Sequence, residues 1–263
     1  MRISDLAIYG DVGRLSSHPD CPPLLWRAEG LPQSFTSQSW GTPWPSSRKV
    51  VTRSPHRRVG RLPVPWLQDF PVSWESNLER DFCKQAAICP GVTGLMSEPV
   101  TFDIKDPSLF ILRKRYSPDF LVSFDTGSKL VVEVRHSARL LLDLPFFIEI
   151  AARFNEAGYS FAVFTERQIY RTPVRVQNAG LIHRYTRNPS ALSFASDFGP
   201  TFSGNFSQLC ENFNLTDLEA IALIGRGSFD FCLDRDLMSA ALFSHFEEGG
   251  GDECFCSKNW FGI

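Results

Sequence analysis

Apolar and polar residues alternate most regularly over residues 115–135, RYSPDFLVSFDTGSKLVVEVR. Because successive side chains of a strand point to opposite faces, this pattern predicts a β-hairpin. Residues 125–127 have the composition of a three-residue turn, in which Gly127 adopts the left-handed conformation. Counting outward from this turn places Asp119 opposite Glu133. The same register gathers six apolar side chains on one face of the hairpin: Phe120, Val122, Phe124, Leu130, Val132 and Val134.

Longer periodicities predict helices on both sides of the hairpin. Apolar stripes with a period near 3.6 mark residues 73–88, 144–158, 172–189, 206–214 and 215–227 as helices. Short apolar runs predict strands over residues 92–104, 159–165 and 228–237. Pro145 is suited to a first helical turn and Gly158 to a C-terminal cap, and Thr216 with Glu219 has the spacing of a capping box. The order of these elements predicts an α/β fold with a central mixed sheet flanked by helices.

Changes in composition divide the chain into four segments. Residues 1–47 are rich in Pro, Ser and Trp, which predicts an extended N-terminal arm whose tryptophans dock onto the folded part. Residues 48–170 hold the hairpin and form the main domain. Residues 171–246 form a small helical unit, which we expect to be winged-helix-like. Residues 247–263 begin with a Gly-rich linker and form a loosely held tail.

The overall composition is that of an ordinary globular protein. Of 263 residues, 43% are hydrophobic and 21% are charged, and the formal net charge is -2. No apolar run approaches the ~20 residues that cross a bilayer, and the N-terminus lacks the apolar stretch of a secretory signal. Seven scattered cysteines suit a reducing compartment better than a disulfide framework. We therefore expect a cytoplasmic protein without membrane contact.

A local excess of positive charge interrupts this neutral background. The stretch RKVVTRSPHRRVGR, residues 48–61, contains no acid. Such a stretch binds phosphate backbones without regard to sequence, although a solvated surface arm has the same composition. Its candidate DNA-binding residues are Arg48, Lys49, Arg53, Arg57, Arg58 and Arg61.

The candidate chemistry lies where the hairpin strands end. Directly opposed carboxylates repel one another, so Asp119 and Glu133 require a compensating cation unless the strand ends fray into water. Glu79 is the candidate for a third acid. Ser76 and Glu79 also have the spacing of a capping box, in which Glu79 only bonds backbone at a helix start. A helix that runs from Trp74 would make Ser76 internal and argue against the cap.

These segments together resemble a known family. A helical Glu, then Pro118-Asp119 opening a strand, then Glu133-Val134-Arg135, resembles the PD-(D/E)xK nuclease core. More narrowly, SNLERDF, RYSPDFLVSF, LVVEVR and TPVRVQNAGLIHRY look like the TnsA endonuclease of heteromeric cut-and-paste transposons. The resemblance runs from about residue 48 to about residue 243.

The resemblance implies a restriction-endonuclease-like fold and a DNA-cutting function. Glu79, Asp119 and Glu133, with the carbonyl of Val134, would hold Mg²⁺, for which Mn²⁺ would substitute. The family cuts the 5′ ends of the transposon, while a DDE transposase cuts and joins the 3′ ends. An AAA+ ATPase regulator contacts its C-terminal region. The expected protein is thus a bacterial, nucleoid-associated subunit that works on double-stranded DNA at transposon ends.

One position departs from the family pattern, which ends in lysine where this chain has Arg135. Arginine stays charged in proteins, so Arg135 could stabilise a phosphate electrostatically but could not act as a base. Lys129 lies too far along its strand to substitute, which leaves three lysines as candidates: Lys84, Lys105 and Lys114. An alternative function is therefore a catalytically weak adaptor that keeps the fold and bridges DNA, transposase and ATPase.

Overall fold

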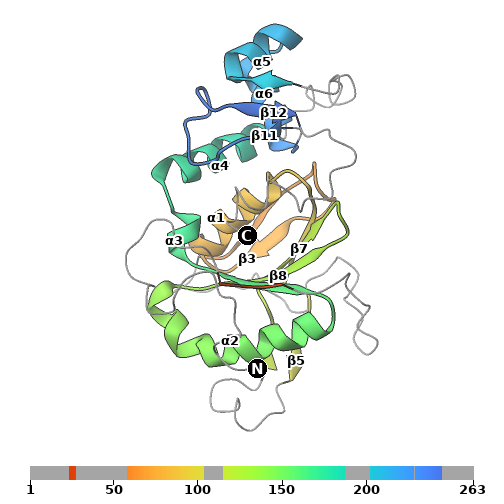
Figure 1. Cartoon of the computed structure of the whole chain (residues 1–263), viewed down its shortest axis with the longest axis vertical. Coiled ribbons are helices and arrows are strands. Elements are labelled where there is room, and N and C mark those ends of the chain that lie inside the picture. Colours follow the sequence, from red (N-terminus) through yellow and green to blue (C-terminus); the bar gives the residue numbers. More distant parts are fainter. Residues whose placement is uncertain (1–23, 28–57, 104–114, 187–201, 228, 245–263) are drawn as a thin grey trace.

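The β7–β8 hairpin has the register that the sequence predicts. The computed structural model describes residues 24–27, 58–103, 115–186, 202–227 and 229–244 (Figure 1). Strand β7 (Phe120–Phe124) pairs antiparallel with β8 (Lys129–Val134), and Phe120 lies opposite Val132. Gly127 has a φ of 81°, as the turn requires. Extended by one residue, this register sets Asp119 opposite Glu133.

The hairpin forms the middle of a five-stranded sheet with the order β1-β9-β8-β7-β4. Strands β8 and β9 (Ser160–Phe164) are parallel, whereas the other pairs are antiparallel, so the predicted mixed sheet is confirmed. Strand β4 (Val92–Ser97) forms one edge and is shorter than the strand predicted over residues 92–104. The other edge strand is β1 (Leu24–Trp26), which the arm's composition does not predict. There Trp26 pairs with Phe161 and is 6% exposed, so this tryptophan docks as expected.

Two helices cover opposite faces of the sheet, as Figure 1 shows. Helix α1 (Asn77–Ala87) packs on the face that carries all six apolar hairpin residues predicted to lie together. Helix α2 (Ser137–Glu156) packs on the other face, against Leu121 and Val131. Burial of both faces explains why the central strands are apolar almost throughout. The structure is thus an α/β arrangement of three layers.

Both helices begin at residues other than those predicted. Residues 72–74 form strand β3 (Val72–Trp74), paired with β2 (Gly60–Leu62), and α1 starts only after its N-cap, Ser76. Helix α2 starts at Ser137, so Pro145 lies inside the helix and not in its first turn. Pro145 is exposed, and water can therefore bond the carbonyl that its missing N–H leaves open. Gly158, with a φ of 79°, follows the C-terminal cap as predicted.

The C-terminal elements pack on the side of α1 that faces away from the sheet (Figure 1). Their helices are α3 (Glu166–Ile169), α4 (Pro173–Tyr185), α5 (Phe206–Phe213) and α6 (Asp217–Gly225). Three short strands form a sheet of order β10-β12-β11: β10 (Ser203–Gly204), β11 (Phe229–Asp230) and β12 (Leu242–Ser244). The capping box of Thr216 and Glu219 is confirmed. The strand predicted over residues 228–237 is wrong beyond β11, because a turn follows that strand.

Buried polar contacts join the C-terminal elements to α1. The guanidinium of Arg175 donates two hydrogen bonds of 3.0 Å to Asp234 and one of 3.2 Å to Gln85. One hydrophobic cluster runs from the sheet through α1 to α6. The boundary expected at residue 170 remains a prediction. None of the described helices combines the length and the apolar character that a transmembrane helix needs.

Candidate functional site

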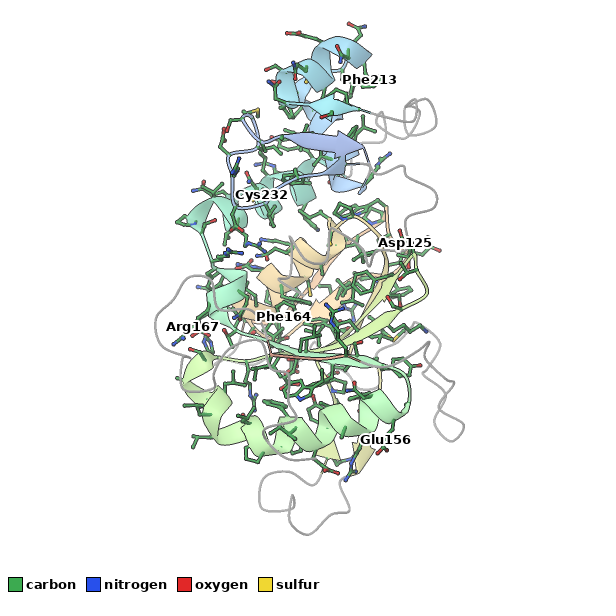
Figure 2. All side chains as sticks on the ribbon, viewed as in Figure 1. Asp125, Glu156, Phe164, Arg167, Phe213 and Cys232 are labelled. Carbon is green, nitrogen blue, oxygen red and sulfur yellow. The ribbon has the colours of Figure 1, made fainter. Side chains whose placement is uncertain are left out.

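A cleft of about 890 Å³ opens where β7 begins and β8 ends. In Figure 2, Asp125 marks the hairpin turn and Phe164 marks the opposite end of the strands, where Arg135 N–H donates to the Phe164 carbonyl at 2.8 Å. The lining of the cleft includes every residue predicted to be catalytic or metal-ligating: Glu79, Asp119, Glu133, Val134 and Arg135. The fold therefore brings together residues from α1 and from both hairpin strands.

Asp119 and Glu133 lie together in this cleft, Asp119 partly buried and Glu133 buried. The Val134 N–H donates to Asp119 Oδ2 at 2.7 Å, and the Tyr116 hydroxyl donates to Glu133 Oε2 at 2.9 Å. Glu133 is only 2% exposed. Burial raises the pKa of Asp119 well above its ordinary value, and the nearby carboxylates of Glu133 and Glu79 raise that pKa further. Both carboxylates are thus held by hydrogen bonds at ordered strand ends, and neither end is frayed into water.

Glu79 belongs to the cleft and also caps its own helix. The Glu79 N–H donates to Ser76 Oγ at 3.1 Å, and the Ser76 hydroxyl donates back to Glu79 Oε1 at 2.9 Å. The Glu75 N–H donates to Glu79 Oε2 at 2.7 Å. Ser76 is thus confirmed as the N-cap, while the Glu79 carboxylate bonds the backbone N–H of Glu75, one residue before the N-cap. The prediction that Ser76 is internal to the helix is wrong, because residue 74 belongs to β3. Since the same carboxylate acts on the pKa of Asp119, capping does not remove it from the site.

Arg135 lies in the cleft beside a carboxylate of α2. Its Nη2 and Nε atoms lie 2.8 and 2.9 Å from Asp143 Oδ2, and its Nη1 lies 3.8 Å from Glu133 Oε1. The guanidinium therefore joins the end of β8 to α2 and neutralises part of the acidic charge. Its fork geometry suits an oxyanion or a carboxylate equally well.

No lysine lines this cleft in the described part of the chain. Lys129 sits at the far end of β8, as expected. Lys84 lies in the last turn of α1, where its ammonium group is 3.4 Å from Asp81. Lys105 and Lys114 lie outside the described residues. Among the described residues, the basic position of the site is therefore filled by arginine.

Two of the six candidate DNA-binding residues of the basic stretch lie in the described part of the chain. Arg48, Lys49, Arg53 and Arg57 lie outside the described residues. Arg58 and Arg61 are exposed, and neither lines the cleft. Their DNA-binding role stays a prediction.

Sequence reasoning missed three cleft residues that the fold supplies. Arg115, Tyr116 and Arg139 come from β6 (Arg115–Tyr116) and from the first turn of α2. Strand β6 pairs with β5 (Phe102–Asp103) in a separate ribbon. Arg115 and Tyr116 belong to the stretch predicted as a hairpin, but they pair with β5 and not with β8, so the prediction is wrong there. These residues meet the acids only after the ribbon and α2 fold onto the sheet. The adjacency of Tyr116 to the hairpin was the one available signal.

The donor set has the chemistry that Mg²⁺ prefers. Carboxylates and a backbone carbonyl are hard oxygen ligands, and Mg²⁺ commonly takes one or two carboxylates together with substrate phosphate. No group of three or more His, Cys, Asp or Glu side chains in the described ranges is arranged to hold a metal ion as it stands.

Two comparisons with known proteins gave no match. No model of a known protein family matches the chain, and no curated protein matches it. The opposed acids and the arginines of the cleft are thus the basis for a functional proposal.

Proposed function

We propose that the chain is a Mg²⁺-dependent DNA endonuclease, the TnsA-type subunit that cleaves the 5′ strands at transposon ends. The observation that carries this proposal is the pair of opposed carboxylates in an open cleft, Glu133 buried and Asp119 partly buried. Such a pair is costly unless a cation compensates it, so its burial supports a metal-binding function. If the two residues had only a structural role, a neutral side chain in place of one carboxylate would make the fold more stable.

Each cleft residue has a defined part in this proposal. Asp119, Glu133 and the Val134 carbonyl hold the metal, and Glu79 adds negative charge from the start of α1. Bound Mg²⁺ or Mn²⁺ activates a water and stabilises the leaving oxygen of an in-line phosphodiester displacement. Arg135 holds the scissile phosphate by its planar fork, and Asp143 fixes the orientation of that fork.

The arrangement of elements supports a PD-(D/E)xK nuclease core. The sheet combines an antiparallel hairpin with a parallel strand reached through a covering helix, and the acids lie at the hairpin's open end. In the same proposal, residues 171–246 form a winged-helix-like unit that contacts an AAA+ ATPase. A DDE transposase would complete the 3′ reactions, and the assembly would act on the bacterial nucleoid.

A second candidate function is a catalytically weak adaptor that binds DNA and bridges the transposase and the ATPase. The observation that favours it is the engagement of Arg135 by Asp143 at 2.8 Å, in a position where the family pattern has lysine. A guanidinium held in this way cannot serve as a base. The adaptor would keep the fold and the DNA contacts while leaving 5′ ends uncut.

Metal binding and cleavage separate these candidates. Calorimetric titration with Mg²⁺ or Mn²⁺ should show binding to the wild-type protein and none to Asp119→Ala. In a reconstituted transposition reaction, mapped 5′ ends should appear with wild type and disappear with Asp119→Ala. Equal 5′ cleavage by both proteins would refute the site. Metal binding without any 5′ cleavage by wild type would favour the adaptor.

A further inference from the structure

Two exposed arginines line the same cleft as the acids. Arg115 on β6 and Arg139 on α2 both line the cleft, and both are exposed. Arg115 is the neighbour of Tyr116, whose hydroxyl donates to Glu133. Both positive charges thus border the region of Asp119 and Glu133 while remaining accessible to an incoming molecule.

The position of Arg139 is unfavourable for its own helix. Arg139 is the third residue of α2, and the first turn of that helix contains no acid. A cation near a helix N-terminus is repelled by the positive end of the helix dipole. No ion pair joins Arg139 to any other residue in the described part of the chain, whereas Arg135 is held by Asp143. The Glu166 carboxylate, which accepts from the Ser137 N–H at 2.9 Å, offsets part of this repulsion, and an external anion beside Arg139 would offset more of it.

The acids of the cleft make such an anion-binding wall necessary for a nucleic-acid substrate. Glu75, Glu79, Asp119 and Glu133 line the same cleft and repel a phosphate backbone. Arginine's planar fork binds a phosphate through two parallel hydrogen bonds. Cations at the exposed wall can therefore hold phosphates near the buried acids.

We propose that Arg115 and Arg139 bind phosphates of duplex DNA next to the phosphodiester that lies over the carboxylates. This inference rests on the proposed DNA-cutting function and identifies the contacts that position the strand. It assigns the principal contact with the DNA backbone to the wall of the cleft and not to the basic stretch of residues 48–61. Both arginines are binding and positioning residues, since phosphate contacts fix register without reading sequence.

Fluorescence anisotropy with a short labelled DNA duplex of arbitrary sequence tests the proposal. Binding is measured in EDTA, so that no cleavage occurs, over a series of salt concentrations. Arg115→Gln and Arg139→Gln should each weaken binding roughly tenfold, the scale of one charged hydrogen bond. Each should lower the slope of log K against log salt by about 0.9, the value for one lost phosphate contact.

Arg235→Gln is the matched control, because Arg235 is an exposed arginine outside the cleft. It should leave affinity and slope close to wild type. The Tm of Arg139→Gln should be unchanged or higher, since the substitution removes a cation from a helix start. Weaker DNA binding without a lower Tm therefore reports a lost contact rather than unfolding.

The outcomes distinguish this inference from the proposed function. Cleft variants that bind DNA as tightly as Arg235→Gln, or a wild-type protein that binds no duplex, would overturn the phosphate contacts. Weakened binding by the cleft variants supports the contacts, whether or not the protein cuts. Loss of 5′ cleavage in Asp119→Ala, which is measured separately, decides only the endonuclease proposal.

Discussion

Replacing Asp119 by asparagine should stabilise the metal-free protein and abolish its response to Mg²⁺. The amide oxygen of the introduced side chain can still accept the Val134 N–H, which bonds Asp119 Oδ2 at 2.7 Å in the native chain. The substitution therefore removes negative charge and little else. At an effective dielectric of about 20, two carboxylates about 5 Å apart repel by roughly 3 kcal/mol. The raised pKa lets Asp119 avoid part of that cost by keeping a proton.

The effect should grow with pH. The pKa of Asp119 is raised well above its ordinary 3.8, first by burial and then by the charges of Glu133 and Glu79. The folded chain then binds more protons than the unfolded chain, so the free energy of unfolding falls as pH rises from the unfolded pKa through the folded one. In Asp119→Asn, the free energy of unfolding should lack this part of its fall with pH. Above the raised pKa, the free energy of unfolding of Asp119→Asn should exceed that of wild type by about 1–3 kcal/mol. Each kcal/mol corresponds to a rise of about 2–4 °C in Tm.

Thermal unfolding with and without Mg²⁺ measures both effects. At 100 times its Kd, Mg²⁺ should stabilise wild type by about 2.7 kcal/mol and leave Asp119→Asn unchanged. Asp125→Asn is the control, because Asp125 is an exposed carboxylate in the same hairpin whose Oδ1 also accepts a backbone N–H, from Thr126 at 2.8 Å. It should match wild type in both measurements. An Asp119→Asn protein that is less stable without metal and still gains stability in Mg²⁺ would refute the reasoning.

Further substitutions test other parts of the structure. Glu79→Gln should keep the helix cap, because Gln also serves at this position of a capping box, and it should reduce 5′ cleavage. Ser76→Ala removes the cap and should lower the free energy of unfolding by about 1 kcal/mol in a denaturant titration. Arg135→Lys should retain 5′ cleavage in a reconstituted reaction, while Arg135→Ala should lower its rate by about 100-fold, and equal rates would exclude the assigned role. Arg175→Met should destabilise the protein by roughly 3 kcal/mol in urea, because it leaves the Asp234 carboxylate without its bidentate partner. Arg175→Met combined with Asp234→Leu should recover much of that loss, and no recovery would argue against an ion-pair origin.

The sequence alone determined the local features of this protein. Alternation with period 2 and the Gly127 turn specify the hairpin register, because a slip of one residue would move six apolar side chains off the α1 face. The cap at Thr216 forms because its side chain bonds the backbone three residues ahead, so neighbouring residues suffice to predict it. Asp119 and Glu133 were paired by the same local counting.

Helix starts were predicted less well, because tertiary pairing overrides local preference. Val72–Trp74 continues the apolar stripe of α1 in sequence, yet it forms a strand because Gly60–Leu62 lies beside it. Pro145 indicated a helix start, but packing of Leu140 and Phe147 against the sheet extends α2 through it. Leu24–Trp26 becomes an edge strand only because β9 presents an unpaired edge to it.

The tertiary structure alone decided which charges meet at the cleft. Glu79 reaches Asp119 through the packing of α1 on one sheet face, and Arg139 reaches the cleft through the packing of α2 on the other. Arg135 acquires Asp143 as a partner for the same reason. Local pattern specifies strands, turns and caps, since those depend on neighbouring residues. The electrostatic balance of the site depends on side chains brought together by the packing of both helices, so only the folded chain reveals it.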